Sequence, residues 1–161
     1  MANDAKKETK TITRNRKALH NYFVDEEYEA GIVLYGSEVK SLRDARVQLT
    51  DAYARFDRNE LWLVSAHISP YPYATHVNHE PERPRKLLLH RRELNRLRNK
   101  VETAGYTLIP LELYFSGSNV KVRIGLCRGK KLFDKRESVR KREAAREIAR
   151  ETADAKRQWK D

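Results

Sequence analysis

The chain has 161 residues, enough for one domain with a buried core plus an extension but too few for two full domains. Its 34 Lys and Arg against 23 Asp and Glu give a formal net charge of +11, and its single cysteine, Cys127, excludes an internal disulfide. No apolar run approaches the roughly 18 residues of a membrane-spanning helix. Residues 1–10 also lack an apolar signal core, so we expect a soluble, unexported protein of the reducing cytoplasm.

The basic excess lies at the two ends of the chain. Residues 1–17 hold six basic and two acidic side chains and residues 128–161 hold thirteen and seven, whereas residues 18–127 hold fifteen and fourteen. Cationic ends suit a polyanionic partner, because each phosphate that Lys or Arg neutralises releases condensed counterions. An anionic membrane surface would attract the same ends, but the lack of an apolar span counts against it.

The first segments combine a polar start with period-two alternation. Residues 1–13 are Lys-rich and poor in apolar side chains, so we expect a flexible basic N-terminus. Between residue 19 and Gly36, apolar and polar residues alternate in two short runs, which predicts an antiparallel pair of short strands. The alternating residues are Tyr22, Val24, Tyr28, Ala30, Ile32 and Leu34.

The spacing becomes helical over residues 37–46. Ser37 suits a helix N-cap, Glu38 suits the positive end of the helix, and Leu42 suits its inward face. A basic ridge follows at i, i+3 and i+6, formed by Lys40, Arg43 and Arg46. The ridge is open to two interpretations, the solvated side of an amphipathic helix or part of an RNA-binding surface.

A hairpin and a long loop come next. Residues 51–68 alternate around a turn at residues 57–59, which predicts a β-hairpin. Residues 69–86 hold four of the five prolines and show no stable period, so we expect a surface loop of the kind that often carries function. Tyr71 and Tyr73 in this loop are well placed for exposure, and their rings suit stacking on RNA bases.

A longer helix and a second hairpin complete the body. Leu94 and Leu97 mark one face of a helix over residues 90–104, and Gly105 suits its C-terminal stop. Residues 106–128 alternate on both sides of a Gly-containing turn. Short strands around two helices predict a mainly β fold, a small closed or nearly closed antiparallel barrel.

Beyond Gly129, large apolar residues become too few to make a packed face. Residues 143–159 are rich in good helix formers and offer Glu and Arg at helical spacings. We expect a helix that forms when this segment docks on a partner, since a segment without a core needs another surface to fold against. The predicted organisation is a flexible N-terminus at residues 1–13, a body at residues 14–131 and a tail at residues 132–161.

Signatures of catalysis and of metal binding are scarce. His76 and His79 form an H-x-x-H pair, but no Cys accompanies them. The acidic cluster at residues 26–29 lies on strand positions and is more typical of a solvated face than of an acid–base pair. Cys127 stands in an alternating apolar run, which predicts a buried, unreactive thiol. Hydrolase and nucleotide-binding motifs are missing too, so we predict no catalytic residue, no metal and no cofactor.

Five short motifs resemble a single family. They are NRKAxHxYF at residues 15–23, YEAG at 28–31, GSEVKSLR at 36–43, RKLLL at 85–89 and GKKxxDKR at 129–136. In order and spacing they are similar to small protein B, the family of bacterial tmRNA-binding (SsrA-binding) proteins, from about Asn15 to Arg136. Residues 137–161 resemble the family less well.

The resemblance implies an antiparallel oligonucleotide-binding (OB) type barrel with flanking helices, which embraces the elbow of the tRNA-like domain of tmRNA. It implies a non-enzymatic factor in the rescue of stalled ribosomes by trans-translation. Family RNA-face positions match Asn15, Arg16, His20, Glu29 and Leu88, with Arg16 standing where Lys is often found. Basic and aromatic residues extend the predicted RNA-binding set to Lys17, Tyr22, Lys40, Arg43, Arg85, Lys86 and Lys121.

The resemblance further implies a flexible tail, disordered alone, that folds as a helix in the vacant mRNA path of the small ribosomal subunit. Residues expected at the decoding centre are Gly129, Lys130, Lys131, Phe133, Asp134, Lys135 and Arg136. Phe133 stands where relatives commonly have His, which keeps stacking but loses a protonatable donor. The expected partners are tmRNA, the small ribosomal subunit with its rRNA, and elongation factor Tu through aminoacylated tmRNA, with the chain acting as a monomer.

Two other functions stay open on the residues alone. A general ribosomal or assembly protein would also anchor to rRNA through basic ends, and it would be found in ribosomes that are not stalled. An RNA-processing enzyme would cleave purified RNA in a way that depends on His20 or Glu29.

Overall fold

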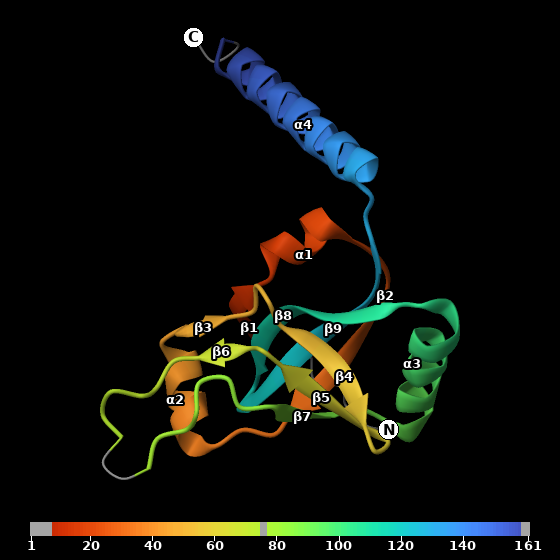
Figure 1. Ribbon diagram of the computed structural model, residues 1–161. Coiled ribbons are helices and arrows are strands. Elements are labelled where there is room, and N and C mark those ends of the chain that lie inside the picture. The colour runs from red at the N-terminus through yellow and green to blue at the C-terminus, as the bar shows by residue number, and fades with distance from the viewer. Residues whose placement is uncertain (1–7, 75–76, 159–161) are drawn as a thin grey trace, which may run out of the picture. The chain divides into compact units, whose positions relative to one another are not determined.

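The computed structural model describes residues 8–74 and 77–158, the side chains of residues 132 and 133 excepted (Figure 1). The chain divides into two units, Met1–Arg128 and Gly129–Asp161. The first unit holds the sheet and three helices, and the second holds the C-terminal helix. The sequence analysis places the boundary between body and tail after residue 131, and that boundary stays a prediction.

A mostly antiparallel seven-stranded sheet forms the first unit. Its strand order is β1-β8-β4-β5-β7-β2-β9, and β8 also pairs with β9. The strand pairing therefore returns to β8, which gives the barrel-like arrangement that the sequence predicts. The strands are β1 (Thr9–Arg14), β2 (Tyr22–Ile32), β4 (Tyr53–Asp57), β5 (Glu60–Val64), β7 (Arg85–Leu88), β8 (Thr107–Ser116) and β9 (Asn119–Gly129), with β3 (Val47–Gln48) and β6 (His67–Ile68) in a separate two-stranded sheet.

Strand β1 includes residues 9–13, which the sequence analysis assigns to a flexible N-terminus, while residues 1–7 of that segment lie outside the described residues. Thr9–Arg14 pair with β8 from Thr9 opposite Ser116 to Arg14 opposite Glu112. Three of the six residues in β1 are β-branched Thr, which suits a strand, and Ile12 packs against the core. The folded body therefore begins earlier than its low apolar content indicates.

A short helix and one long strand replace the two strands predicted between residue 19 and Gly36. Helix α1 (Arg16–Asn21) precedes β2, whose eleven residues run without a break through the acidic stretch 25–27. Partners compensate these acidic side chains. Asp25 forms an ion pair with Arg128 at 3.0 Å, and hydrogen bonds from Tyr106 and Arg128 lower the pKa of Asp25.

The two longer helices of the body agree with the sequence prediction. Helix α2 (Gly36–Arg43) and helix α3 (Arg91–Ala104) lie on opposite sides of the sheet in Figure 1. Gly105 ends α3 with a φ of 68°, in the left-handed region that glycine adopts without strain. The N-cap of α2 is Tyr35 rather than Ser37, and the Tyr35 backbone N–H donates to Glu38 Oε1 at 2.9 Å.

Both predicted hairpins are present. Asp57 pairs with Glu60, so the β4–β5 loop consists of Arg58 and Asn59, and both have positive φ as a type I′ turn requires. In the β8–β9 hairpin, Ser116 pairs with Asn119 across a turn at residues 117–118. These turns set the register that places alternate side chains inside and outside the sheet.

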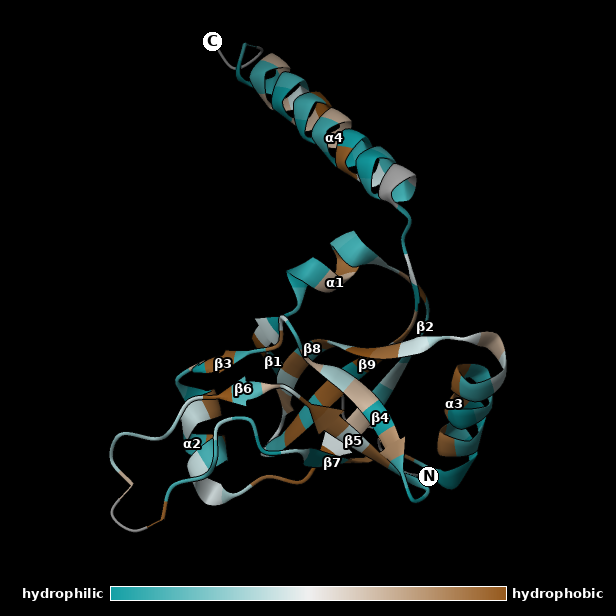
Figure 2. Ribbon diagram, viewed as in Figure 1, coloured by the Kyte–Doolittle hydropathy of each residue, from teal (hydrophilic) through white to brown (hydrophobic). Residues whose placement is uncertain are grey.

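The core lies inside the sheet. Leu61, Leu87 and Ile124 are buried there, and Leu97 of α3 packs into the same cluster. Figure 2 shows the hydrophobic colour along β8 and β9 and the hydrophilic colour over most of the C-terminal helix. A second cluster joins α1 to the sheet and includes Cys127, a buried thiol whose pKa burial raises to about 11. This agrees with the prediction of an unreactive thiol.

The second unit is helix α4 (Leu132–Gln158), and the side chains of residues 140–158 are all exposed. A helix agrees with the helix-forming composition, and its dependence on a partner stays a prediction. Within residues 8–74 and 77–158, no helix is both long and apolar enough to cross a membrane.

Candidate nucleic-acid interface

Asn15 fixes the position of helix α1. Its Nδ2 donates to the carbonyl oxygens of Leu49 at 3.1 Å and Pro110 at 3.0 Å, and its Oδ1 accepts from the backbone N–H of Ala18 at 3.2 Å. The residue is only 5% exposed. Its polar atoms are therefore used inside the protein, where they position α1, and the RNA contact expected from the sequence stays a prediction.

The outer side of α1 presents basic residues between two hollows. Arg16 and Lys17 are exposed and His20 is partly exposed. A hollow of about 440 Å³ is lined by Lys17 and Tyr22 among others, and a second of about 450 Å³ is lined by Arg14 and Arg16 among others. Four residues of the predicted RNA-binding set therefore lie together on α1 and at the start of β2, namely Arg16, Lys17, His20 and Tyr22.

The outer face of β8 and β9 continues this basic surface. Arg123 Nη1 donates to Glu112 Oε2 at 2.6 Å and lines the second hollow, while Glu112 also accepts from Thr11 Oγ1 at 2.6 Å. Lys121 lies two residues from Arg123 on β9 and therefore faces the same side. Arg14, Arg123 and Glu112 are missing from the predicted RNA-binding set, although the spacing of Lys121 and Arg123 signals a shared face.

Glu29 lies at the edge of the same face. The Tyr114 hydroxyl donates to Glu29 Oε2, and burial together with the Glu29 carboxylate raises the pKa of Tyr114. Arg123 lies over the Tyr114 ring, with its Cζ 5.5 Å from the ring centroid. Glu29 therefore orients an aromatic and basic cluster through the Tyr114 hydroxyl.

Leu88 and Lys86 extend the face onto β7. Leu88 is 51% exposed and pairs with Gly31 of β2, where a Cβ would lie only 3.3 Å from Leu88 Cβ. Gly31 therefore lets the two strands approach closely and leaves Leu88 projecting outward. Lys86 Nζ donates to Glu60 Oε1 at 3.0 Å and stays partly exposed.

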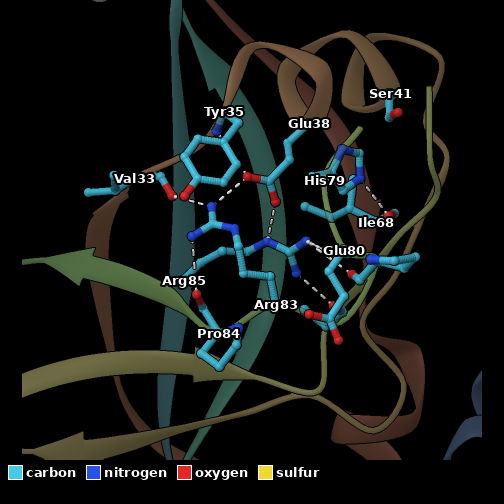
Figure 3. A network of polar contacts seen from close by, with 12 residues as sticks. Val33, Tyr35, Glu38, Ser41, Ile68, His79, Glu80, Arg83, Pro84 and Arg85 are labelled. Atoms are coloured by element: carbon cyan, nitrogen blue, oxygen red, sulfur yellow. Dashed lines mark hydrogen bonds and ion pairs between the residues drawn. The ribbon is translucent and has the colours of Figure 1, made fainter. Parts of the chain in front are cut away.

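Arg85 does not belong to this surface, which corrects its place in the predicted RNA-binding set. Its side chain is fully buried and its Nε donates to Glu38 Oε2 (Figure 3). Arg83 Nη2 also donates to Glu38, at 2.5 Å. Burial alone would raise the pKa of Glu38, but the Tyr35 N–H and the two guanidinium groups hold it below the ordinary value. Burial lowers the pKa of Arg85, yet a guanidinium stays charged at physiological pH, so the pair is ionised.

Lys40 and Arg43 form a second basic region on α2. Lys40 Nζ lies 5.4 Å from the centroid of the Tyr71 ring. Arg43 lines a hollow of about 600 Å³ together with Lys10 of β1 and the β8–β9 turn. Because β1 contains both Lys10 and Arg14, it connects this region with the hollow beside α1.

The predicted decoding-centre residues lie at the start of the second unit. The Lys131 backbone N–H donates to Asp134 Oδ2 at 3.3 Å and Lys130 Nζ donates to Ser138 Oγ at 2.9 Å, so Asp134 and Ser138 organise the first turn of α4. Lys135 is partly exposed, and Gly129 and Arg136 are exposed. The side chain of Phe133 lies outside the described residues.

The histidine pair offers no metal site among the residues described. His79 is buried, with Nδ1 2.9 Å from Ser37 Oγ and Nε2 2.8 Å from the Ile68 carbonyl oxygen, and His76 lies outside the described residues. Over residues 8–74 and 77–158, no group of three or more His, Cys, Asp or Glu is arranged to hold a metal ion.

Comparisons with known proteins identify the family of this chain. The SmpB protein family model matches residues 12–154. The SsrA-binding proteins of Carboxydothermus hydrogenoformans and Roseiflexus castenholzii are each 56% identical to this chain, over 86% and 88% of its length and 93% and 90% of theirs. A chain in a solved structure described as "tmRNA-SmpB: a journey to the center of the bacterial ribosome" is 49% identical with a TM-score of 0.65, over 80% of this chain and 94% of that one. The chain therefore belongs to the SmpB family of SsrA-binding proteins.

Proposed function

We propose that this chain binds the tRNA-like domain of tmRNA and acts in the rescue of stalled ribosomes by trans-translation. The observation that best supports this proposal is the surface around α1. Two hollows there are lined by basic residues, namely Arg14, Arg16, Lys17 and Arg123. The relatives of the chain are SsrA-binding proteins. Guanidinium and ammonium groups on a rigid face suit the phosphates of a folded RNA, which is recognised mainly by its shape.

The proposed role of the body is to grip the RNA without chemistry. Asn15 holds α1, Glu112 holds Arg123, and Glu29 holds Tyr114, so the cationic groups are placed before RNA arrives. A preorganised face loses less side-chain entropy on binding. His20, Tyr22, Lys121 and Leu88 complete the proposed contact surface. No bond is made or broken by the chain, and the tmRNA is delivered to the ribosomal A site.

The proposed role of the tail is to enter the vacant mRNA channel. Helix α4 has 27 residues and is therefore about 40 Å long. Residues 128–161 carry thirteen basic and seven acidic side chains, a balance that favours a path lined by rRNA. Lys131, Asp134, Lys135 and Arg136 would lie at the decoding centre. A message still present in the channel would exclude the helix by its volume, so only a ribosome without one would be engaged.

The remaining partners follow from this role. The chain acts in the cytoplasm as a monomer, contacts the small ribosomal subunit and its rRNA, and joins elongation factor Tu through aminoacylated tmRNA. Alanine charging and peptide transfer belong to other components.

A gel shift with the transcribed tRNA-like domain of tmRNA, in competition with intact tRNA, tests the proposal. Arg16→Glu reverses an exposed charge beside the second hollow and should weaken binding about tenfold or more. Arg55→Glu reverses an exposed charge on β4 and serves as the matched control. Equal weak binding of the wild type to any RNA would contradict the proposal. Stable presence in ribosomes that are not stalled would instead favour a general ribosomal protein.

A further inference from the structure

An exposed aromatic pair stands on the loop between β6 and β7, outside the surface around α1. Tyr73 is 77% exposed, and its ring centroid lies 5.6 Å from that of Tyr71, with an interplanar angle of 69°. In such an edge-to-face pair, the ring that presents its edge keeps both of its own faces uncovered by the other ring. Lys40 Nζ lies 5.4 Å from the Tyr71 centroid, so a cation borders the pair.

The loop is held in shape directly beneath the two rings. The Asn78 side chain forms two hydrogen bonds with the backbone of Tyr71. Asn78 Oδ1 accepts from the Tyr71 N–H at 3.1 Å, and Asn78 Nδ2 donates to the Tyr71 carbonyl at 2.8 Å. The Ala74 N–H also donates to the Tyr71 carbonyl, at 3.2 Å, which closes a turn with Pro72 at its second position. An exposed aromatic pair is thus carried on an ordered turn.

The base of the loop is attached to α2 and to the core. Ser41 Oγ donates to the Ser69 carbonyl at 2.7 Å, and buried His79 joins Ser37 of α2 to the Ile68 carbonyl. Arg85 Nη2 donates to the Pro81 carbonyl at 3.0 Å. The fold therefore fixes an exposed aromatic surface next to the basic side of α2.

We propose that Tyr71, Tyr73 and Lys40 form a stacking platform for one unpaired nucleotide of RNA, with a base on the Tyr73 ring and Lys40 beside the flanking phosphate. A base stacks on any aromatic face, and a neighbouring ammonium group neutralises the phosphate. Arg43, three residues after Lys40 on the same side of α2, adds a second cation to this region. This charge favours RNA over an apolar protein surface.

The inference rests on the proposed RNA-binding function and adds a contact separate from the surface around α1. The nucleotide would come either from a loop of tmRNA or from rRNA. Because both sources present the same chemistry, they must be tested separately. One binding assay uses the transcribed tRNA-like domain, and the other uses protein-free rRNA of the small subunit.

The test compares Tyr73→Ala with two matched variants in the full-length chain. Tyr73→Phe keeps the ring, and Val77→Ala shortens another highly exposed side chain of the same loop. Loss of one stacked base should weaken binding roughly 5- to 150-fold. We expect this loss for Tyr73→Ala with at least one of the two RNAs, and we expect it to persist as the salt concentration rises. Tyr73→Phe and Val77→Ala should bind with near wild-type affinity. The loss for Lys40→Ala should shrink with salt.

Four results would contradict either the stacking platform or the proposed function. Unchanged affinity of Tyr73→Ala for both RNAs would overturn the platform, while wild-type binding to the tRNA-like domain would leave the proposed function standing. Equal losses for Val77→Ala and Tyr73→Ala would also overturn it, since loop shape rather than the ring would matter. A loss seen only in an added assay with intact small subunits, and with neither RNA alone, would place the Tyr73 contact outside the two RNAs tested and overturn the platform. Failure of the wild type to bind the tRNA-like domain would count against the proposed function itself.

Discussion

Glu38 and Arg85 lie 47 positions apart in the chain and form a fully buried ion pair that joins α2 to β7. Arg85 also donates to the Ala66 carbonyl at 2.8 Å and to the Pro81 carbonyl at 3.0 Å. The pair thus connects a helix and a sheet strand with the β5–β6 connection and with the loop that carries Tyr71 and Tyr73. Glu38 and Arg85 belong to the GSEVKSLR and RKLLL motifs, and in this structure both stabilise the fold.

Glu38→Gln should lower the free energy of unfolding by about 3–5 kcal/mol, because it leaves the buried Arg85 charge without a carboxylate. Urea denaturation measures the change. Glu60→Ala is the control, since it removes the partly exposed pair with Lys86 and should cost at most about 1 kcal/mol. Similar costs for the two variants would contradict a special role for the buried pair.

The pH dependence of stability should differ between the wild type and Glu38→Gln. The folded-state pKa of Glu38 lies below its ordinary value of 4.5, so the unfolded chain takes up this proton first as the pH falls. The stabilisation by Glu38 is therefore complete above about pH 4.5 and is lost as the pH falls through the folded-state pKa. Unfolding free energies measured from pH 7 downward should converge for the two proteins below pH 4.5, and a constant gap would contradict this.

Asn15→Ala should weaken both stability and RNA binding, since it removes the α1 cap and two hydrogen bonds to carbonyl oxygens. We expect a loss of about 2 kcal/mol in the free energy of unfolding. Arg16→Ala should weaken binding of the tRNA-like domain while changing stability by at most about 0.5 kcal/mol. If Asn15→Ala kept full stability and still lost RNA affinity, Asn15 would be a direct RNA contact.

The features predictable from sequence are those set by local signals. The β4–β5 hairpin follows from its turn at Arg58 and Asn59. Helix α3 follows from the spacing of Leu94 and Leu97 and from its stop at Gly105. The family motifs predict the partner and bring Arg16, Lys17 and His20 to one helix. Signals of such short range do not reveal contacts between residues that are far apart in the sequence.

The parts that sequence reasoning missed depend on distant partners. The burial of Arg85 follows from Glu38, and the burial of Asn15 follows from carbonyl groups on residues 49 and 110. Likewise β1 becomes a strand because β8 offers it an edge, which no pattern within residues 9–14 reveals. Basic residues in a motif therefore cannot be sorted into surface and core until the sheet is assembled.

The central claim is that the body binds tmRNA while the tail acts separately on the ribosome. The most direct measurement compares a chain ending at Gly129, and a full-length Lys135→Glu/Arg136→Glu variant, with the wild type. Affinity for the tRNA-like domain and peptide tagging on stalled ribosomes are measured for each. We predict near wild-type affinity with tagging abolished in both variants. A parallel loss of RNA affinity, or tagging that survives removal of the tail, would contradict the claim.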